Sequence, residues 1–160
     1  MEDFKILIVE DELLVSVDLK HILESMDYDV IGSASSGEEA ISIAGKTFPD
    51  IVLMDIMLKG DLDGIETAVL IHNLYDIPIV YLTAYHTSEI LERAKKAEPY
   101  GYIVKPFNEF QLHSTIEIAC YNHSKGTKIW KNNRNYNQRM EYHNIKLWYS
   151  PKNLNIFLKH

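Results

Sequence analysis

Residues 50–64 constrain the fold more than any other stretch of the chain. Four apolar residues, Ile51 to Met54, lead directly into one carboxylate, Asp55, and turn-forming residues follow as far as Gly64. A short apolar run bounded by turn signals is typical of a strand that is buried on both faces. We therefore expect Asp55 at the carboxyl end of a buried strand, where open α/β sheets bind their ligands. A carboxylate there either caps the strand end or performs chemistry, and its position alone does not decide between the two.

The same pattern of an apolar strand followed by a helix recurs along the first 121 residues. The predicted strands cover residues 4–9, 28–34, 51–54, 79–82 and 100–104. Helical patterns follow them, such as the capping signal formed by Ser36 and Glu39 and the apolar stripe made of Val15, Leu19, Ile22 and Met26. Buried strands joined by helical crossovers form a parallel sheet with helices on both faces. The sequence therefore predicts an α/β fold, a doubly wound five-stranded parallel sheet in the flavodoxin-like order 2-1-3-4-5.

The charge changes sign near residue 121. Residues 1–120 carry 8 basic and 22 acidic side chains, whereas residues 121–160 carry 8 and 1. We therefore divide the chain into a domain at 1–121 and a short basic C-terminal extension at 122–160, which is rich in asparagine and aromatic residues. For this extension three hypotheses stay open: packing on its own acidic domain, binding of a partner or of a second copy, and nucleic-acid binding.

The cysteine content and the N-terminus indicate a cytoplasmic protein. The chain has a single cysteine, Cys120, which excludes an internal disulfide framework and fits a reducing compartment. No stretch approaches the ~18 consecutive apolar residues of a membrane span, and the acidic start is unlike a signal peptide. We therefore expect no membrane insertion.

Polar groups stand at the carboxyl ends of all the predicted strands except the second. They are Glu10 and Asp11 after the first strand, Asp55 after the third, Thr83 after the fourth and Lys105 after the fifth. In the order 2-1-3-4-5 the first and third strands are neighbours, so their acidic ends meet at the switch point of the sheet.

A group of carboxylates without His or Cys favours a hard cation. Crowded carboxylates repel one another unless a cation neutralises them, and oxygen ligands alone select Mg²⁺ over zinc. Mg²⁺ prefers a site completed by phosphate oxygens. Lys105 would add a positive charge for such a group, and Thr83 a hydrogen bond. Aspartyl phosphates are an established covalent intermediate, and Asp55 is the natural acceptor.

Five short motifs give the chain a family resemblance. They are Ile8-Val9-Glu10-Asp11-Glu12, Val52-Leu53-Met54-Asp55-Ile56, Asp63-Gly64, Tyr81-Leu82-Thr83-Ala84 and Gly101-Tyr102-Ile103-Val104-Lys105-Pro106-Phe107. In this order they resemble the response-regulator receiver domain of two-component signalling, the family of the chemotaxis response regulator, over residues 4 to about 121. Each motif alone is weak evidence, but five in register are specific.

The resemblance implies roles for the acidic residues. Asp55 would accept a phosphoryl group from a sensor histidine kinase or a phosphotransfer protein. Asp11 and Asp55 would bind Mg²⁺ directly with the backbone carbonyl of Met57, and Glu10 would act through a bound water. The protein would then be a stand-alone receiver, a signalling switch that catalyses only its own phosphotransfer and autodephosphorylation and controls binding to a downstream protein. Whether phosphorylation also produces a homodimer stays open.

The remaining motif residues match the switch of the family. Lys105 would pair with the phosphoryl group, and its bond to Pro106 would be cis. Thr83 and Tyr102 match the switch pair, in which the hydroxyl moves toward the phosphoryl group and the aromatic ring turns into the vacated space. Lys59 is a departure, because the family usually has proline at this position, and the loop to Asp63 is one residue longer than common. The shape of this loop is therefore open.

Two rival functions use the same fold. A phosphatase or phosphotransferase with an aspartyl nucleophile usually has a second carboxylate two residues after the nucleophile, where this chain has Met57. A flavin or nucleotide carrier would have a glycine-rich loop after the first strand, where this chain has Glu10 and Asp11.

Overall fold

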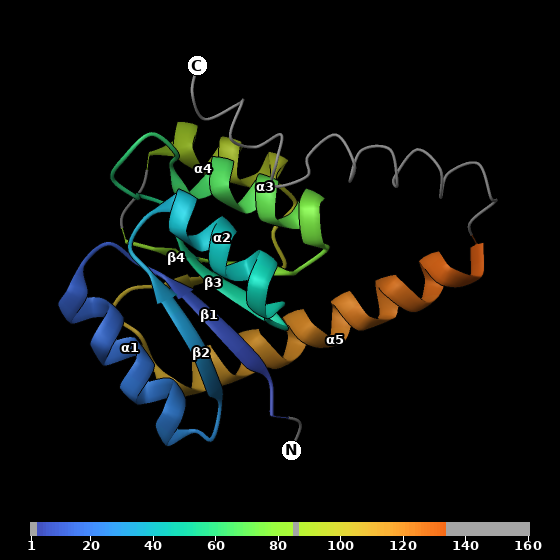
Figure 1. Cartoon of the computed structure of the whole chain (residues 1–160), viewed down its shortest axis with the longest axis horizontal. Helices are drawn as coiled ribbons and strands as arrows, with labels where there is room; N and C mark the ends of the chain where they lie inside the picture. Colours follow the sequence, from blue (N-terminus) through green and yellow to red (C-terminus); the bar gives the residue numbers. More distant parts are fainter. Residues whose placement is uncertain (1–2, 85–86, 134–160) are drawn as a thin grey trace. The chain divides into compact units, whose positions relative to one another are not determined.

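The chain folds into alternating strands and helices, and the computed structural model describes residues 3–84 and 87–133 (Figure 1). The strands are β1 (Lys5–Val9), β2 (Asp29–Ala34), β3 (Ile51–Asp55), β4 (Ile79–Thr83) and β5 (Gly101–Val104). The helices are α1 (Leu13–Ser25), α2 (Gly37–Thr47), α3 (Gly64–Tyr75), α4 (Ser88–Lys96) and α5 (Glu109–Asn133). The chain divides into two compact units, Met1–His123 and Ser124–His160.

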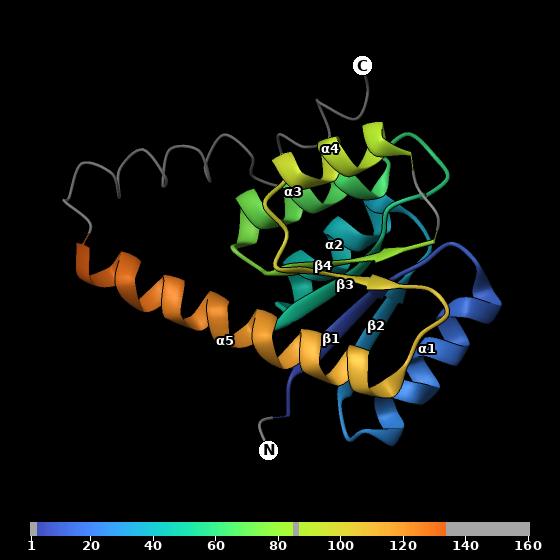
Figure 2. The same ribbon diagram turned by 180° about the vertical axis from the view of Figure 1, so that it is seen from behind.

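The five strands form one parallel sheet in the order β2-β1-β3-β4-β5, which confirms the predicted fold class. Helices α1 and α5 cover one face of the sheet, and α2, α3 and α4 cover the other (Figures 1 and 2). Strands β1 and β3 are neighbours, with Val9 in register with Met54. Val9 is followed in the chain by Glu10, and Met54 by Asp55. The pairing of the two strands therefore brings these two carboxylates together.

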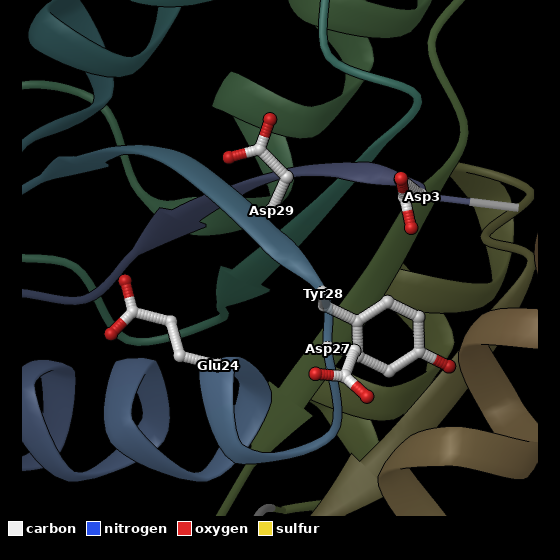
Figure 3. Close-up of a pocket in the computed structure, with 5 residues that line it drawn as sticks. All are labelled: Asp3, Glu24, Asp27, Tyr28 and Asp29. Carbon is white, nitrogen blue, oxygen red and sulfur yellow. The ribbon is translucent and has the colours of Figure 1, made fainter.

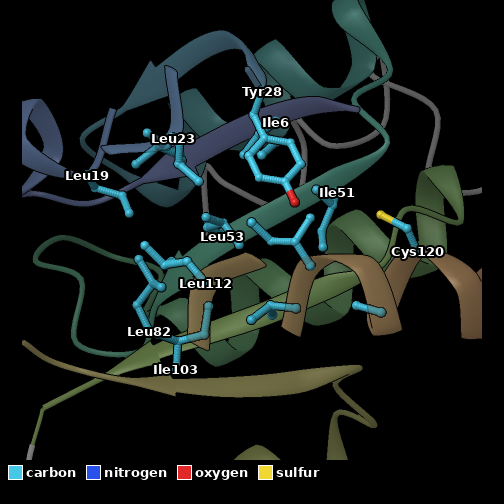
Figure 4. Packing of buried hydrophobic residues seen from close by; sticks show 14 residues of the cluster. Ile6, Leu19, Leu23, Tyr28, Ile51, Leu53, Leu82, Ile103, Leu112 and Cys120 are labelled. Carbon is cyan, nitrogen blue, oxygen red and sulfur yellow. The ribbon is translucent and has the colours of Figure 1, made fainter. Parts of the chain in front are cut away.

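The main hydrophobic cluster lies between the sheet and helices α1 and α5 (Figure 4). Strands β1 and β3 contribute Ile6 and Leu53, while α1 and α5 contribute Leu19 and Leu112, all fully buried. The strands are continuously apolar because both of their faces are covered. Burial of such side chains contributes roughly 1.5–3 kcal/mol each, so the strand ends that carry the polar groups are held in a rigid frame.

Polar side chains cap the starts of α2, α3 and α4. Ser36 accepts a hydrogen bond from the amide of Glu39 at 3.2 Å, so the predicted start of α2 is confirmed. The Glu39 carboxylate accepts from the amide of Ser35 instead of that of Ser36. A complete capping box at α3, formed by Asp63 and Glu66, was not expected from the sequence. Each cap satisfies amides that the helix leaves unpaired.

Helix α5 is longer than the sequence indicates. We expected it to end between residues 121 and 126, but its backbone continues to Asn133. No proline interrupts this stretch, and Gly126 alone costs a helix only about 1 kcal/mol relative to alanine. Residues 134–160, the larger part of the predicted basic extension, lie outside the described residues. In the part of the chain that is described, no helix is both long and apolar enough to cross a bilayer.

Candidate functional site

Three carboxylates gather at the carboxyl edge of the sheet. Glu10 and Asp11 follow β1, and Asp55 is the last residue of β3. One oxygen from each carboxylate can be chosen so that all three lie within 4.8 Å of one another. The structure therefore brings together the three acids that the sequence places at the ends of neighbouring strands, and their oxygens form a donor set suited to a hard divalent cation.

Lys105 approaches this cluster from the end of β5. Its Nζ donates to Oε2 of Glu10 at 2.7 Å and to Oδ2 of Asp55 at 3.2 Å. The bond between Lys105 and Pro106 is cis, as the resemblance implies. The sequence prediction placed Lys105 opposite Asp55, but the lysine lies closer to Glu10. It therefore joins the ends of β1, β3 and β5.

Burial governs the charges in the site. The exposed fraction is 2% for Glu10 and 5% for Asp55. Burial raises the pKa of Glu10, and the hydrogen bond from Lys105 only partly opposes this effect. For Lys105, burial alone would lower the pKa, but the hydrogen bond to Glu10 and the charge of Asp55 together raise it. The lysine is thus held in its cationic form, while burial disfavours the charged form of Glu10.

Backbone amides of the loop after β3 orient two of the acids. The amide of Met57 donates to Oδ1 of Asp55 at 3.0 Å, and the amide of Lys59 donates to Oδ2 of Asp11 at 3.1 Å. The next residue, Gly60, has φ of 111°, a conformation that favours glycine. The loop whose shape the sequence left open therefore wraps over the acid cluster, and Lys59 contributes its amide to it, which a proline could not.

Gly64, the first residue of α3, packs directly on the backbone of Asp55. Its amide donates to the carbonyl of Ile56 at 3.0 Å. A Cβ added at Gly64 would lie 1.9 Å from the carbonyl oxygen of Asp55, so no larger residue fits without a backbone shift. The start of α3 is therefore fixed to the strand end that carries Asp55.

Thr83 and Tyr102 lie farther along the same edge. Thr83 is buried, and its hydroxyl donates to the carbonyl of Ala84 at 3.0 Å instead of to the acids. The Tyr102 side chain is 36% exposed, and its ring centroid is 6.0 Å from that of Tyr81. The structure thus places the predicted switch pair on adjacent strands without a direct hydrogen bond to Asp55.

Sequence reasoning missed several features around the site. Arg93 of α4 forms an ion pair with Asp63, with 2.7 Å between Nη2 and Oδ2. Leu13, Leu14 and Phe110 are strongly exposed although they are large and apolar. The ion pair spans 30 residues of sequence, and no local signal indicates it. The exposed Leu13 and Leu14 were detectable, because they fall outside the apolar stripe of α1.

A surface pocket lies at the opposite edge of the sheet (Figure 3). It is lined by Asp3, Glu24, Asp27, Tyr28 and Asp29, which lie before β1, at the end of α1 and around the start of β2. The pocket is acidic, but it contains none of the site residues predicted from the sequence. It is therefore separate from the acid cluster at the carboxyl ends of the strands.

The parallel sheet, the acid cluster at its carboxyl edge and the lysine from β5 define a receiver domain. The family model described as the response regulator receiver domain matches residues 6–117. The chain belongs to this family, the receiver domains of two-component response regulators.

Two curated relatives are transcriptional regulatory proteins of bacteria. The transcriptional regulatory protein PdtaR of Mycobacterium tuberculosis is 39% identical over 115 residues, which are 72% of this chain and 56% of PdtaR. The transcriptional regulatory protein YdfI of Bacillus subtilis is 34% identical over 116 residues, 72% of this chain and 54% of YdfI. The chain spans about half the length of the curated relatives it matches.

Solved structures agree with the fold. The signal receiver domain of a modulated diguanylate cyclase from Desulfovibrio desulfuricans G20 superposes with a TM-score of 0.76 at 41% identity, covering 78% of this chain and 99% of that one. A CheY-like response regulator receiver domain from Methanospirillum hungatei JF-1 gives a TM-score of 0.70 at 28% identity, covering 78% and 99%. In both comparisons the matched part of this chain is about as long as its first compact unit, Met1–His123.

Proposed function

We propose that the chain is a phosphoacceptor response regulator in which Asp55 takes a phosphoryl group from a histidine kinase or a phosphotransfer protein. One observation carries the proposal: Oδ2 of Asp55 lies 3.2 Å from the Lys105 ammonium, within a cluster of three carboxylates. A carboxylate oxygen of Asp55 would attack the phosphorus of a phosphohistidine. The bond between phosphorus and the imidazole nitrogen would break, and the imidazole would leave with that electron pair.

The donor set fits Mg²⁺, because it consists of carboxylate oxygens without nitrogen or sulfur ligands. Asp11 and Asp55 would hold the ion directly with the carbonyl of Met57, and Glu10 would act through a water. When bound, Mg²⁺ neutralises charge on the acids and on the transferred phosphoryl oxygens. The residues of the chain position the group: Lys105 neutralises an oxygen of the phosphoryl group, and the Met57 amide orients the Asp55 carboxylate.

Phosphorylation would act as a switch of partner binding and not as a step of enzymatic turnover. The Thr83 hydroxyl would leave the Ala84 carbonyl for the phosphoryl group, and Tyr102 would turn toward the vacated space. Such a local charge change biases a two-state element. The downstream partner would then recognise the altered surface near β5, with self-association as an alternative outcome.

Exposed apolar side chains next to the acid cluster favour a protein as the phosphodonor. Leu13 and Leu14 follow the acidic turn of Asp11 directly, and Val17 lies three residues beyond Leu14 on the same helical face. Exposed apolar groups of this kind mark interaction surfaces. We propose that this face of α1 docks the histidine-bearing domain of the donor, in the cytoplasm.

The division into a receiver at 1–121 and a basic extension at 122–160 is part of the proposal. The two compact units, Met1–His123 and Ser124–His160, support it. The charge of the extension fits an acidic partner, which includes the receiver itself, another protein and nucleic acid.

Incubation of the full chain with acetyl phosphate and Mg²⁺ tests the proposal. We expect one acid-labile phosphoryl group per chain, detected by intact-mass spectrometry, which disappears when Mg²⁺ is chelated and in the Asp55→Asn variant. Asp61→Asn, which changes an exposed aspartate of the adjacent loop, is the matched control and should be labelled normally. Labelling of Asp55→Asn at the same site would reject the proposal, and multiple turnover of a small phosphorylated substrate would favour the phosphatase rival.

A further inference from the structure

Tyr81 of β4 carries a buried hydroxyl without a hydrogen-bond partner. Its side chain is 0% exposed, and its oxygen is the only buried side-chain polar atom in the described residues that lacks a partner. A buried polar group without a hydrogen bond destabilises the folded state, because it has lost its hydrogen bonds to water. Native structures satisfy nearly all such groups, so an exception calls for a physical account.

The position of Tyr81 in the sheet connects it to the site. It is in register with Met54 of β3, the residue before Asp55, and with Tyr102 of β5. It also precedes Thr83 by two residues, so both side chains point to the same face of the sheet. The Tyr81 and Tyr102 rings lie 6.0 Å apart with 35° between their planes. Tyr81 therefore lies among the residues through which a change at Asp55 would reach β5.

The charged groups near Tyr81 belong to the ion pair between Asp63 and Arg93. Burial raises the pKa of the Tyr81 hydroxyl, Tyr102 and the charge of Asp63 add to this effect, and the charge of Arg93 opposes it. The Asp63 carboxylate accepts from the Glu66 amide with Oδ1 and from Arg93 with Oδ2. The charge of the Asp63 carboxylate thus acts on the Tyr81 hydroxyl, although the two groups are not hydrogen-bonded.

A short path of contacts connects Asp63 to Asp55. The next residue, Gly64, donates its amide to Ile56 and packs against the Asp55 carbonyl so closely that a Cβ would not fit. A shift of the Asp55 backbone therefore has to move the start of α3. Asp63 caps that helix and holds Arg93 of α4. Movement at the acid cluster would thus reach the Asp63 carboxylate.

We propose that Tyr81 is a positioning residue of the switch, whose hydroxyl is unpaired in the resting arrangement and donates a hydrogen bond to the Asp63 carboxylate when Asp55 is phosphorylated. The inference rests on the proposed function, because it assigns a further residue to the regulation of the same site. The new bond stabilises only the phosphorylated arrangement, so the hydroxyl shifts the equilibrium toward it. It would also draw Asp63 away from Arg93, which loosens the connection between α3 and α4.

Tyr81→Phe removes the hydroxyl and keeps the ring. The measurement is the apparent affinity of the full chain for beryllofluoride, a mimic of the phosphoryl group, in the presence of Mg²⁺, followed by the rise in melting temperature. We expect affinity about tenfold weaker than that of wild type, equivalent to about 1.4 kcal/mol. Without the mimic, the variant should be at least as stable as wild type. Equal affinities, or a variant that is clearly less stable without the mimic, would overturn the proposal.

Two further variants separate this role from general packing. Tyr75→Phe removes a half-buried hydroxyl near the end of α3 and should leave the affinity for beryllofluoride unchanged. Arg93→Met removes the competing donor from Asp63, so the Tyr81 hydroxyl can bond in both states. Tyr81→Phe should then have no further effect on the affinity in the Arg93→Met background. A tenfold loss in Tyr75→Phe, or an undiminished effect in the double variant, would contradict the proposal.

The same titration distinguishes failure of the inference from failure of the proposed function. A wild-type chain that gains no stability from beryllofluoride with Mg²⁺ would contradict the phosphoacceptor function itself. A wild-type chain that gains stability, with an identical gain in Tyr81→Phe, would leave that function intact and assign Tyr81 to core packing alone.

Discussion

The ammonium group of Lys105 lies 2.7 Å from a carboxylate oxygen of Glu10 and 3.2 Å from one of Asp55. One cation thus holds the acids of two neighbouring strands, while Asp11 accepts a hydrogen bond from the amide of Lys59. Three carboxylates face one ammonium at this edge of the sheet. The imbalance favours capture of a divalent cation, and it makes the lysine structurally important whenever that cation is absent.

Lys105→Met should destabilise the chain strongly in the absence of divalent cations. The substitution leaves two buried carboxylates without their counter-charge, and breaking a buried pair in this way costs roughly 3–5 kcal/mol. Urea denaturation in the presence of a chelator measures the change. Because Mg²⁺ supplies positive charge to the same acids, its addition should recover part of the lost stability.

The control for this prediction is Lys95→Met. Lys95 pairs with Glu92 at 3.0 Å, but both side chains are about two-thirds exposed, at 65% and 67%. Exposed pairs of this kind contribute at most about 1 kcal/mol. If the two variants lost the same stability, Lys105 would not be the counter-charge of the acid cluster.

Glu10→Gln should change how stability depends on pH in the metal-free protein. Burial raises the pKa of Glu10 above its ordinary value of 4.5. Between pH 4.5 and that raised pKa, the unfolded chain has lost the proton of Glu10 while the folded chain keeps it. The free energy of unfolding therefore falls as the pH rises through this window. The variant lacks this contribution, so its stability relative to wild type should increase with pH.

Urea denaturation of both proteins at several pH values from 4.5 to neutrality, with a chelator present, measures this difference. Glu38→Gln, which removes a carboxylate from the first turn of α2, is the control for the loss of one negative charge elsewhere in the domain. A constant difference between wild type and Glu10→Gln across the window would show that ionisation of Glu10 is not opposed by burial.

The sequence predicts the acid cluster because local patterns determine it. A short apolar run that ends in Asp55 and is bounded by turn residues predicts a buried strand, and the order of a doubly wound sheet then places β1 beside β3. Lys105 is predicted at the same edge of the sheet, because the carboxyl ends of parallel strands all lie there. Its preference for Glu10 over Asp55 is not predicted, because that depends on side-chain positions that only the packed structure fixes.

Long-range contacts account for what the sequence did not predict. The ion pair of Asp63 and Arg93 depends on how α4 packs beside α3. Whether the Tyr81 hydroxyl finds a hydrogen-bond partner depends on which side chains surround it in the packed interior. The predicted end of α5, between residues 121 and 126, is wrong for a different reason. Gly126 favours a helix end, but helix propensity is a weak preference that neighbouring residues override.

Gly64→Ala should destabilise the chain and impair phosphorylation together. The added Cβ would lie 1.9 Å from the carbonyl oxygen of Asp55, which belongs to backbone and cannot rotate away. Forcing an extra methyl group into a packed site costs on the order of 3 kcal/mol. The displaced strand end should also lower the rate of labelling by acetyl phosphate, measured by intact mass at a temperature where the variant is folded.

Gly126→Ala is the control for that substitution, and its expected effect has the opposite sign. Nothing lies within 4 Å of a Cβ at Gly126, which is within α5. Alanine in a helix is more favourable than glycine by about 0.5–1 kcal/mol, so this variant should be slightly more stable and be labelled normally. Normal labelling of Gly64→Ala would show that the contact between α3 and Asp55 is dispensable for the chemistry.

Mg²⁺ should stabilise the wild-type chain, and Asp11→Asn should weaken that effect. An ion that binds only the folded state adds about 2.7 kcal/mol to the free energy of unfolding when its concentration is a hundredfold above Kd. Asp11→Asn replaces one of the three clustered carboxylates by a neutral amide, so the same Mg²⁺ concentration should add much less. Melting temperatures over a Mg²⁺ titration measure both, with Asp61→Asn, in the exposed turn, as the control that should respond like wild type. Equal stabilisation of Asp11→Asn and wild type would place the ion elsewhere and remove Asp11 from the site.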